Sequence, residues 1–290
     1  MIKFSPSDAA LEGFRLTRER PGTILAWCAV YLAGLFIIAL AMTATLGPKF
    51  VELARKGELV TAQDPEALAT LLGGSWPAFI VVLMMTVLLI SVIMGGIYRL
   101  VMRPSEHGFA HLRLGMDELR LAVVNLVLVL VGAAFLLLGV IVSQIAAQGG
   151  GMVAVVSDLV LVCITIWIGV RLSLVTPMTF DSGRIAFRAA WRLTRNRFWP
   201  LLGMVVLAVI FYIIVWVLMS VISLGVVALC GGEQALKDVT KLTPLTGLAA
   251  VATLVLQLLL QILQIVMIYG PFAVAYQQVA KGPDVPAQPA

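Results

Sequence analysis

The sequence predicts an all-α polytopic membrane protein with six transmembrane helices, and three observations support this fold class. Of its 290 residues, 61% are hydrophobic and only 12% are charged, whereas soluble domains carry about 25% charged residues. The charge deficit comes from six long, nearly uncharged runs, each long enough to cross a hydrocarbon core about 30 Å thick. Basic residues gather at the ends of these runs, where they favour contact with lipid headgroups. A membrane β-barrel would instead show short segments of alternating hydrophobicity.

The apolar runs set the expected element boundaries. We expect spans at residues 23–46, 76–100, 121–145, 152–175, 199–229 and 244–276, within a single membrane domain over residues 1–280. A cleaved signal peptide is the alternative for the first run, but that run is longer than the usual apolar region of about 7–15 residues. The first connection, 47–75, is polar and predicts short helices at 48–56 and 65–72. The Pro-rich tail, 281–290, is expected to be disordered.

The distribution of Lys and Arg predicts the orientation. Six spans place both termini on one side, and that side holds fifteen of the 20 basic residues, against five on the other. The side that is richer in Lys and Arg normally faces the cytoplasm. We therefore expect a multi-pass protein of the bacterial inner membrane, with cytoplasmic N- and C-termini.

Two basic amphipathic segments precede spans. Residues 1–21 predict one helix. In the stretch DSGRIAFRAAWRLTRNRFWPLL, residues 181–202, Asp181 or Ser182 can cap a second helix. Helical spacing then places four arginines on one face and an aromatic face beside it, as in a helix that lies in the membrane interface. The arginines are Arg184, Arg188, Arg192 and Arg195, and the neighbouring face holds Phe187, Trp191, Thr194 and Phe198. An ordinary positively charged loop that only fixes topology is the alternative.

Similar motifs elsewhere suggest an internal repeat. Residues 14–20, FRLTRER, match residues 191–197, WRLTRNR, and residues 109–120 form a looser third copy. Each copy precedes an apolar span. The pattern predicts three units, each an interfacial helix followed by a transmembrane hairpin, around a shared axis or interface.

The stretch RLSLVTPMTFDSGRIAFRAAWRLTRNRFWPLLG resembles bacterial multi-spanning proteins related to the membrane domain of glycerophosphoryl diester phosphodiesterases. The shared residues are Arg171, Leu172, Pro177, Asp181, Gly183, Ala190, Trp191, Leu193, Thr194 and Arg195. The resemblance covers about thirty residues well and the six-span layout loosely. It implies a membrane domain. In those phosphodiesterases catalysis belongs to a separate soluble barrel domain, which we do not expect within this chain.

Two further arginines, Arg99 and Arg171, sit near the cytoplasmic ends of spans two and four. Such side chains commonly extend to the interface with their stems in the apolar region. The alternative is that they bind a lipid phosphate between spans.

Polar residues inside the spans suggest two interpretations. Asp158 is the one acid within an apolar run, and a carboxyl at mid-membrane costs about 2.5–3.5 kcal/mol on insertion scales. It could relay protons or cations, or it could be an acid near the outer interface bonded to Ser143, Gln144 or Gln148. Gln257, Gln261 and Gln264 form a stripe on span six, which could join helices or line a substrate path together with Asn125.

Several function classes lack support. His107 and His111 have metal-ligand spacing but no third ligand, so we expect no metal site and no cofactor. The isolated cysteines, Cys28, Cys163 and Cys230, predict no disulfide. No nucleotide-binding loop or catalytic motif is present, so we do not expect an enzyme. The net charge of +5 is explained by lipid rather than by nucleic acid.

Two functions remain as hypotheses. In the first, basic interfacial helices engage anionic lipid, a protein partner or a second copy of the chain. In the second, the protein is a transporter or lipid translocase with a polar path lined by Asp158 and the glutamines.

Overall fold

A computed structural model describes residues 6–55, 75–106, 108–195, 197–229 and 244–281. Within these ranges the protein is all-α, and six helices are long and apolar enough to cross a membrane. The elements are α1 (Pro6–Glu19), α2 (Pro21–Arg55), α4 (Trp76–Met102), η1 (Phe109–His111), α5 (Met116–Gln148), α6 (Gly151–Leu172), α7 (Val175–Ser182), α8 (Phe187–Thr194), α9 (Phe198–Leu229), α11 (Pro244–Tyr276) and the π-helical turn η3 (Gln277–Lys281).

The six expected spans coincide with α2, α4, α5, α6, α9 and α11. The largest difference is in α2, which continues through Pro48 to Arg55 instead of ending near residue 46. Proline is tolerated in long membrane helices because local adjustments satisfy the freed carbonyl. The separate helix expected at 48–56 is therefore wrong. The helix expected at 65–72 and the tail beyond Lys281 lie outside the described residues.

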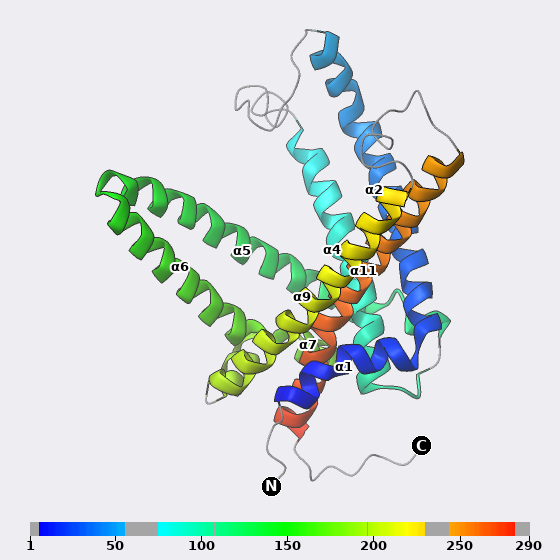
Figure 1. Ribbon diagram of the computed structural model, residues 1–290. Coiled ribbons are helices and arrows are strands. Elements are labelled where there is room, and N and C mark those ends of the chain that lie inside the picture. The colour runs from blue at the N-terminus through cyan, green and yellow to red at the C-terminus, as the bar shows by residue number, and fades with distance from the viewer. Residues whose placement is uncertain (1–5, 56–74, 107, 196, 230–243, 282–290) are drawn as a thin grey trace.

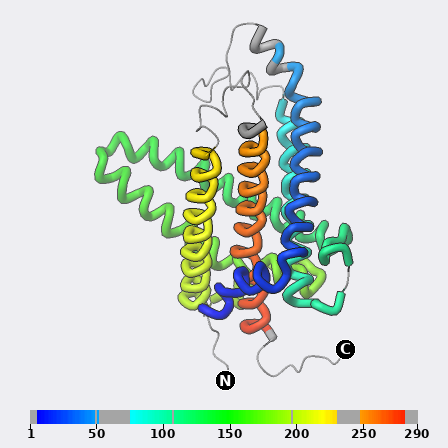
Figure 2. The backbone as a smooth tube through the Cα atoms, turned by 45° about the vertical axis from the view of Figure 1, so that its right-hand side comes forward, coloured from blue at the N-terminus to red at the C-terminus, as the bar shows by residue number. Residues whose placement is uncertain are grey.

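One part of the molecule is closely packed. Helices α2, α4, α9 and α11 run side by side, and α1 crosses them at one end (Figures 1 and 2). The largest core cluster joins α2, α4 and α11 through buried side chains such as Trp27, Ile93, Tyr98 and Val266. A third (33%) of the most apolar stretch of α4, and the same share of that of α11, is buried inside the protein.

The α5–α6 hairpin forms the other part. It leaves the bundle near the start of α5 and extends to one side, shown in green in Figure 1. None (0%) of the most apolar stretch of α5 and only 6% of that of α6 is buried by the rest of the chain. Gly150 adopts φ 100° at the tip, a left-handed conformation that favours glycine. The hairpin thus exposes apolar surface along most of its length.

Helix α1 packs on α11 and α9. Gly13 makes this possible, because a Cβ at that position would lie 2.8 Å from the Cα of Met267. Ala9, Ala10 and Leu16 are buried in the same contact. The helix expected within residues 1–21 therefore exists, but Ala9, Ala10 and Leu16 on its apolar face are covered by protein.

Glu12 is buried on that face of α1. Its Oε1 accepts a hydrogen bond of 2.8 Å from Arg15 Nη2. Burial raises the pKa of the Glu12 carboxyl above its ordinary value, and Arg15 acts in the opposite direction. The α1 contact thus contains one titratable group whose charged form is disfavoured by folding.

The repeat expected from the sequence differs in its second unit. Residues 109–120 do not form one interfacial helix, since η1 is a short 3-10 turn and α5 begins at Met116. Ala110 and His111 have positive φ angles of 50° and 60°, which end helical geometry at that point. Helices α1 and α8 are thus the two amphipathic helices that the repeat motif accompanies in the described chain.

Candidate functional site

Helices α1, α7 and α8 and the turn η1 lie at the same end of the molecule, together with the last turn of α11 (Figure 1). Most of the arginines named above come from this end. Some of them are paired with acidic side chains and others are not, and that difference locates the candidate site.

The arginine helix expected from Arg184 to Arg195 is split in two. Helix α7 continues through Ser182, and Gly183 ends it at φ 62°. Ser182 Oγ bonds back to the Met178 carbonyl at 2.7 Å, so Ser182 closes one helix instead of capping the next. Helix α8 begins only at Phe187, after Ala186, which provides no side-chain cap. Arg184 therefore lies in the α7–α8 turn, and the predicted cap at Asp181 or Ser182 is wrong.

The remaining three arginines belong to α8. Arg188 and Arg192 lie in the helix and Arg195 is its C-cap residue, still in helical conformation. All three, like Arg184, are exposed. None of the four guanidinium groups forms a salt bridge with an acidic side chain in the described chain. The sequence gives one reason, because no Asp or Glu occurs between Asp181 and Glu233.

The other face of α8 packs on the protein more than expected. Thr194 is fully buried, and its hydroxyl donates to the Arg171 carbonyl of α6 at 3.2 Å. Ala190 is also buried, beside Phe187. Trp191 remains partly exposed, at 36%. On the α8 face that was expected to enter lipid, Trp191 is the most exposed residue, because Phe187 is half-buried and Thr194 is buried.

Arg171 lies between two tryptophans. Its guanidinium carbon is 5.5 Å from the ring centroid of Trp167 and 5.5 Å from that of Trp191. The rings themselves meet edge to face at 5.5 Å. Cation–π contacts contribute about 0.5–2 kcal/mol each, but they leave N–H groups without acceptors. Arg171 Nε and Nη1 are covered and have no hydrogen-bond partner in the described chain.

Arg99, in contrast, is buried and paired. The exposed fraction of the residue is 4%. Its Nη2 donates to Glu118 Oε1, its Nη1 donates to the His111 carbonyl at 2.5 Å, and its Nε lies 3.3 Å from Glu106 Oε2. Gly95 leaves room for this arrangement, because a Cβ there would come within 3.0 Å of Glu118 Oε1. Arg99 therefore neither extends to the interface nor offers a free charge to a headgroup.

The same interaction network holds the turn before α5. Trp27 Nε1 donates to the Ala110 carbonyl at 2.8 Å, and Arg99 bonds the next carbonyl, that of His111. These two bonds fix the two consecutive residues with positive φ. Non-glycine residues in such conformations cost about 1–3 kcal/mol each. The two hydrogen bonds offset part of this cost and hold η1 in place. His107 lies outside the described residues, and no group of three potential metal ligands occurs within them.

Asp158 lies on the α5–α6 hairpin, away from the packed bundle. Its side chain is exposed and borders a groove that also contains Ser143 and Gln144. No hydrogen bond joins Asp158 to either residue or to Gln148 in the described chain. The acid thus shares a groove with its expected partners without bonding them.

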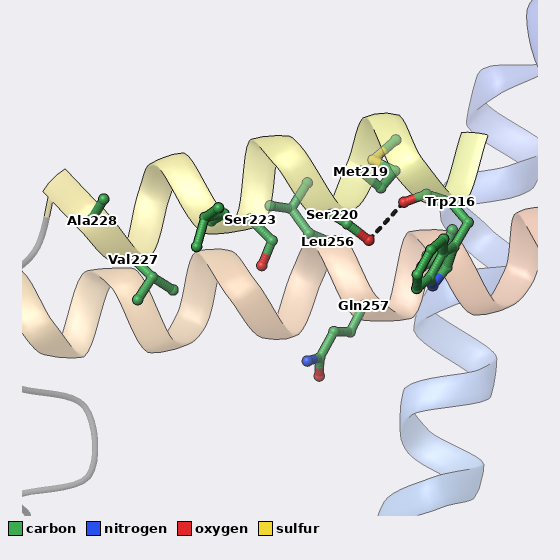
Figure 3. Close-up of a pocket in the computed structure, with 10 residues that line it drawn as sticks. Trp216, Met219, Ser220, Ser223, Val227, Ala228, Leu256 and Gln257 are labelled. Carbon is green, nitrogen blue, oxygen red and sulfur yellow. Dashed lines mark hydrogen bonds between the residues drawn. The ribbon is translucent and has the colours of Figure 1, made fainter. Parts of the chain in front are cut away.

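The polar residues proposed as a path lie in separate places. Gln257 borders a groove of about 540 Å³ between α9 and α11. In Figure 3 its side chain extends below α11, whereas Ser220 and Ser223 extend from α9 above it. Gln261 is exposed, and Gln264 accepts a bond of 3.3 Å from Tyr212 of α9. The bond between Tyr212 and Gln264 joins α9 to α11, which is the alternative role that the sequence suggested for the glutamine stripe.

Asn125 belongs to a third place. It is buried where α5 leaves α4, and its Nδ2 donates to Ser91 Oγ at 2.8 Å. It therefore joins helices and does not line a cavity with Asp158 or the glutamines. The structure does not bring the five residues of the expected path together.

Two residues of the site were missed by sequence reasoning. Trp167 precedes Arg171 by four residues, a spacing that places them on the same helix face. This spacing alone is enough to predict contact between the Trp167 ring and the Arg171 side chain. Glu118 carries no comparable signal, because its pairing with Arg99 depends on how α4 and α5 cross.

Comparison with known proteins adds no relative. No protein-family model, no curated protein and no solved structure matches this chain.

Proposed function

We propose that this multi-pass protein resides in a bacterial inner membrane, with its termini in the cytoplasm, and that α8 engages anionic lipid headgroups. The observation that carries the proposal is the set of exposed, unpaired arginines on α8. Neighbouring arginines at the same end, such as Arg103 and Arg120, have Asp117 within salt-bridge distance. The positive charge of α8 has no such partner among the described residues, so anions outside the protein are its natural counterions.

The position of α8 supports lipid as the source of those anions. The helix packs on α6 and directly precedes α9 in the chain, and both of these helices are long and apolar enough to cross a membrane. Trp191 of α8 and Trp199 at the start of α9 are exposed, and tryptophans gather at membrane–water interfaces. Each Lys or Arg near an anionic leaflet contributes about 1 kcal/mol of attraction. The excess of basic residues at this end also supports its cytoplasmic orientation.

The resemblance to the membrane domain of glycerophosphoryl diester phosphodiesterases stays a prediction that points to the same region. Of the residues that carry it, Trp191 and Thr194 contact Arg171, and Gly183 provides the turn between α7 and α8. We infer that the shared motif maintains this arrangement. No catalytic step is proposed for it. A transport path is not favoured, because Asp158, Asn125 and the glutamines lie in separate places.

The test uses the full chain purified in a neutral detergent and exchanged into mixed phosphatidylglycerol and phosphatidylcholine. The ratio of the two lipids retained after size-exclusion chromatography is measured. We expect enrichment of phosphatidylglycerol that falls in the variant Arg188→Gln, Arg192→Gln, Arg195→Gln. The matched control replaces the same three residues with Lys and should keep the enrichment, because exposed α8 requires positive charge rather than a guanidinium shape.

Salt provides the second arm of this test. The charges of α8 are exposed, so enrichment should decline as ionic strength rises and the screening length shortens. An unchanged lipid ratio in the glutamine variant at low salt would refute the proposal.

A further inference from the structure

Arg171 differs from every other arginine at this end in one respect. It is held by two aromatic rings, and two of its covered nitrogens have no acceptor. A donor buried without a partner is costly in a folded protein, and nearby Glu and Asp side chains could have removed that cost. No described acid does so.

Two arginines of α8 add further positive charge near Arg171. On α8, Arg188, Trp191 and Arg195 are spaced i, i+3 and i+7, so all three lie on one face of the helix. The Trp191 ring on that face is the ring that contacts Arg171. Arg171 of α6 thus contacts the same tryptophan, Trp191, whose helix face also carries the exposed Arg188 and Arg195.

The tryptophans also fix the direction of the guanidinium. Nε and Nη1 are the covered nitrogens, while Arg171 as a whole remains partly exposed. Nη2 is thus the nitrogen left for an external acceptor. Through Nη2 an oriented guanidinium can donate charge-assisted hydrogen bonds to a phosphate oxygen.

We propose that Arg171, between Trp167 and Trp191, is the specific binding site for the phosphate group of one anionic phospholipid. The inference rests on the proposed function, which supplies the lipid, and it adds a defined phosphate position to a diffuse basic surface. Arg188 and Arg195 attract the headgroup, and Arg171 fixes its phosphate at the end of α6. The glycerol backbone and acyl chains then extend toward the membrane-facing surface of the span.

The experiment counts lipids that remain bound to the intact, purified chain by native mass spectrometry, with phosphatidylglycerol or phosphatidylcholine added. We expect one phosphatidylglycerol per chain to persist at high ionic strength, because a partly buried contact is screened less than an exposed one. Arg171→Lys keeps the charge but loses the stacked, planar fork, and should weaken this retained lipid by about tenfold. The Lys variant of α8 described above should keep it.

A second variant and the elution behaviour of both variants distinguish loss of lipid binding from loss of folding. Trp191→Phe retains a ring over the guanidinium with a weaker attraction and should lower retention less than Arg171→Lys does. Both variants should elute as the wild-type chain does. Retention of phosphatidylglycerol by Arg171→Lys equal to that of wild type would overturn the proposal.

Two further measurements distinguish lipid phosphate from inorganic phosphate, and the proposal for Arg171 from the proposal for α8. Excess inorganic phosphate should fail to displace the retained lipid, and displacement by it would overturn the assignment to a lipid. Loss of the low-salt enrichment in the α8 glutamine variant, with no effect of Arg171→Lys at high salt, would leave the general function standing and remove the specific site. The reverse pattern would keep the site and remove the role of α8.

Discussion

Arg99 and Arg171 lie in the last turns of α4 and α6, yet their surroundings in the structure are opposite. Arg99 lies in the packed part of the molecule, where the His111 carbonyl and Glu118 accept hydrogen bonds from its Nη1 and Nη2, and Glu106 forms an ion pair with its Nε. Arg171 lies in the last turn of α6 on the open hairpin, where two tryptophan rings contact it and no acidic side chain of the described residues pairs with it. The comparison teaches that an arginine at a span end can be used by the fold, as Arg99 is, or can keep donors that we propose for a ligand, as Arg171 does. The number of internal acceptors distinguishes the two roles.

The largest expected effect comes from removing the acid that Arg99 requires. Glu118→Ala leaves a buried guanidinium without its carboxylate, and breaking a buried pair on one side destabilises by about 3–5 kcal/mol. The thermal denaturation temperature of the purified chain in detergent should fall clearly. The double variant Glu118→Gln, Arg99→Met should recover most of the loss. An unchanged denaturation temperature in Glu118→Ala would mean that the pair does not hold α4 and α5 together.

Glycines sharpen the contrast between the packed and the open part. Gly13→Ala would place a Cβ 2.8 Å from the Met267 Cα, and overpacking of this kind costs about 1–3 kcal/mol. Gly139→Ala on the hairpin meets nothing within 4 Å, and an alanine in a helix is better than glycine by about 0.5–1 kcal/mol. We therefore expect the first variant to release α1 to limited proteolysis and the second to be neutral or slightly stabilising. Equal protease sensitivity of the two variants would argue against the α1–α11 contact.

The smallest expected effect concerns pH. Because burial raises the pKa of Glu12 in the folded protein, the carboxyl binds its proton more tightly in the folded than in the unfolded chain. Its contribution favours folding below the ordinary carboxyl pKa and is lost as the pH rises through the raised, folded value. Resistance of α1 to proteolysis should thus increase as the pH is lowered toward the carboxyl range. Glu12→Gln should flatten that dependence, while Glu19→Gln should weaken it only slightly, because the charge of Glu19 is the smallest influence on the Glu12 pKa.

The sequence determined the class of the protein and the position of its spans. Long uncharged runs have one stable outcome in lipid, a helix that satisfies its own backbone, so the six spans could be located within a few residues. The sequence also predicted that most of the basic residues, fifteen of 20, lie on one side. It could show that α8 lacks acidic neighbours, because no Asp or Glu occurs nearby in the chain.

Only the tertiary structure decided which polar groups meet. Arg99 pairs with Glu118 across nineteen positions of sequence, and Trp191 reaches Arg171 only because Thr194 and Ala190 seat α8 on α6. The expected polar path failed for the same reason, since the rotation of each span about its axis places Asp158, Gln257 and Asn125 toward different neighbours. Hydropathy fixes how deep a residue lies in the membrane, whereas helix packing fixes which neighbour it faces.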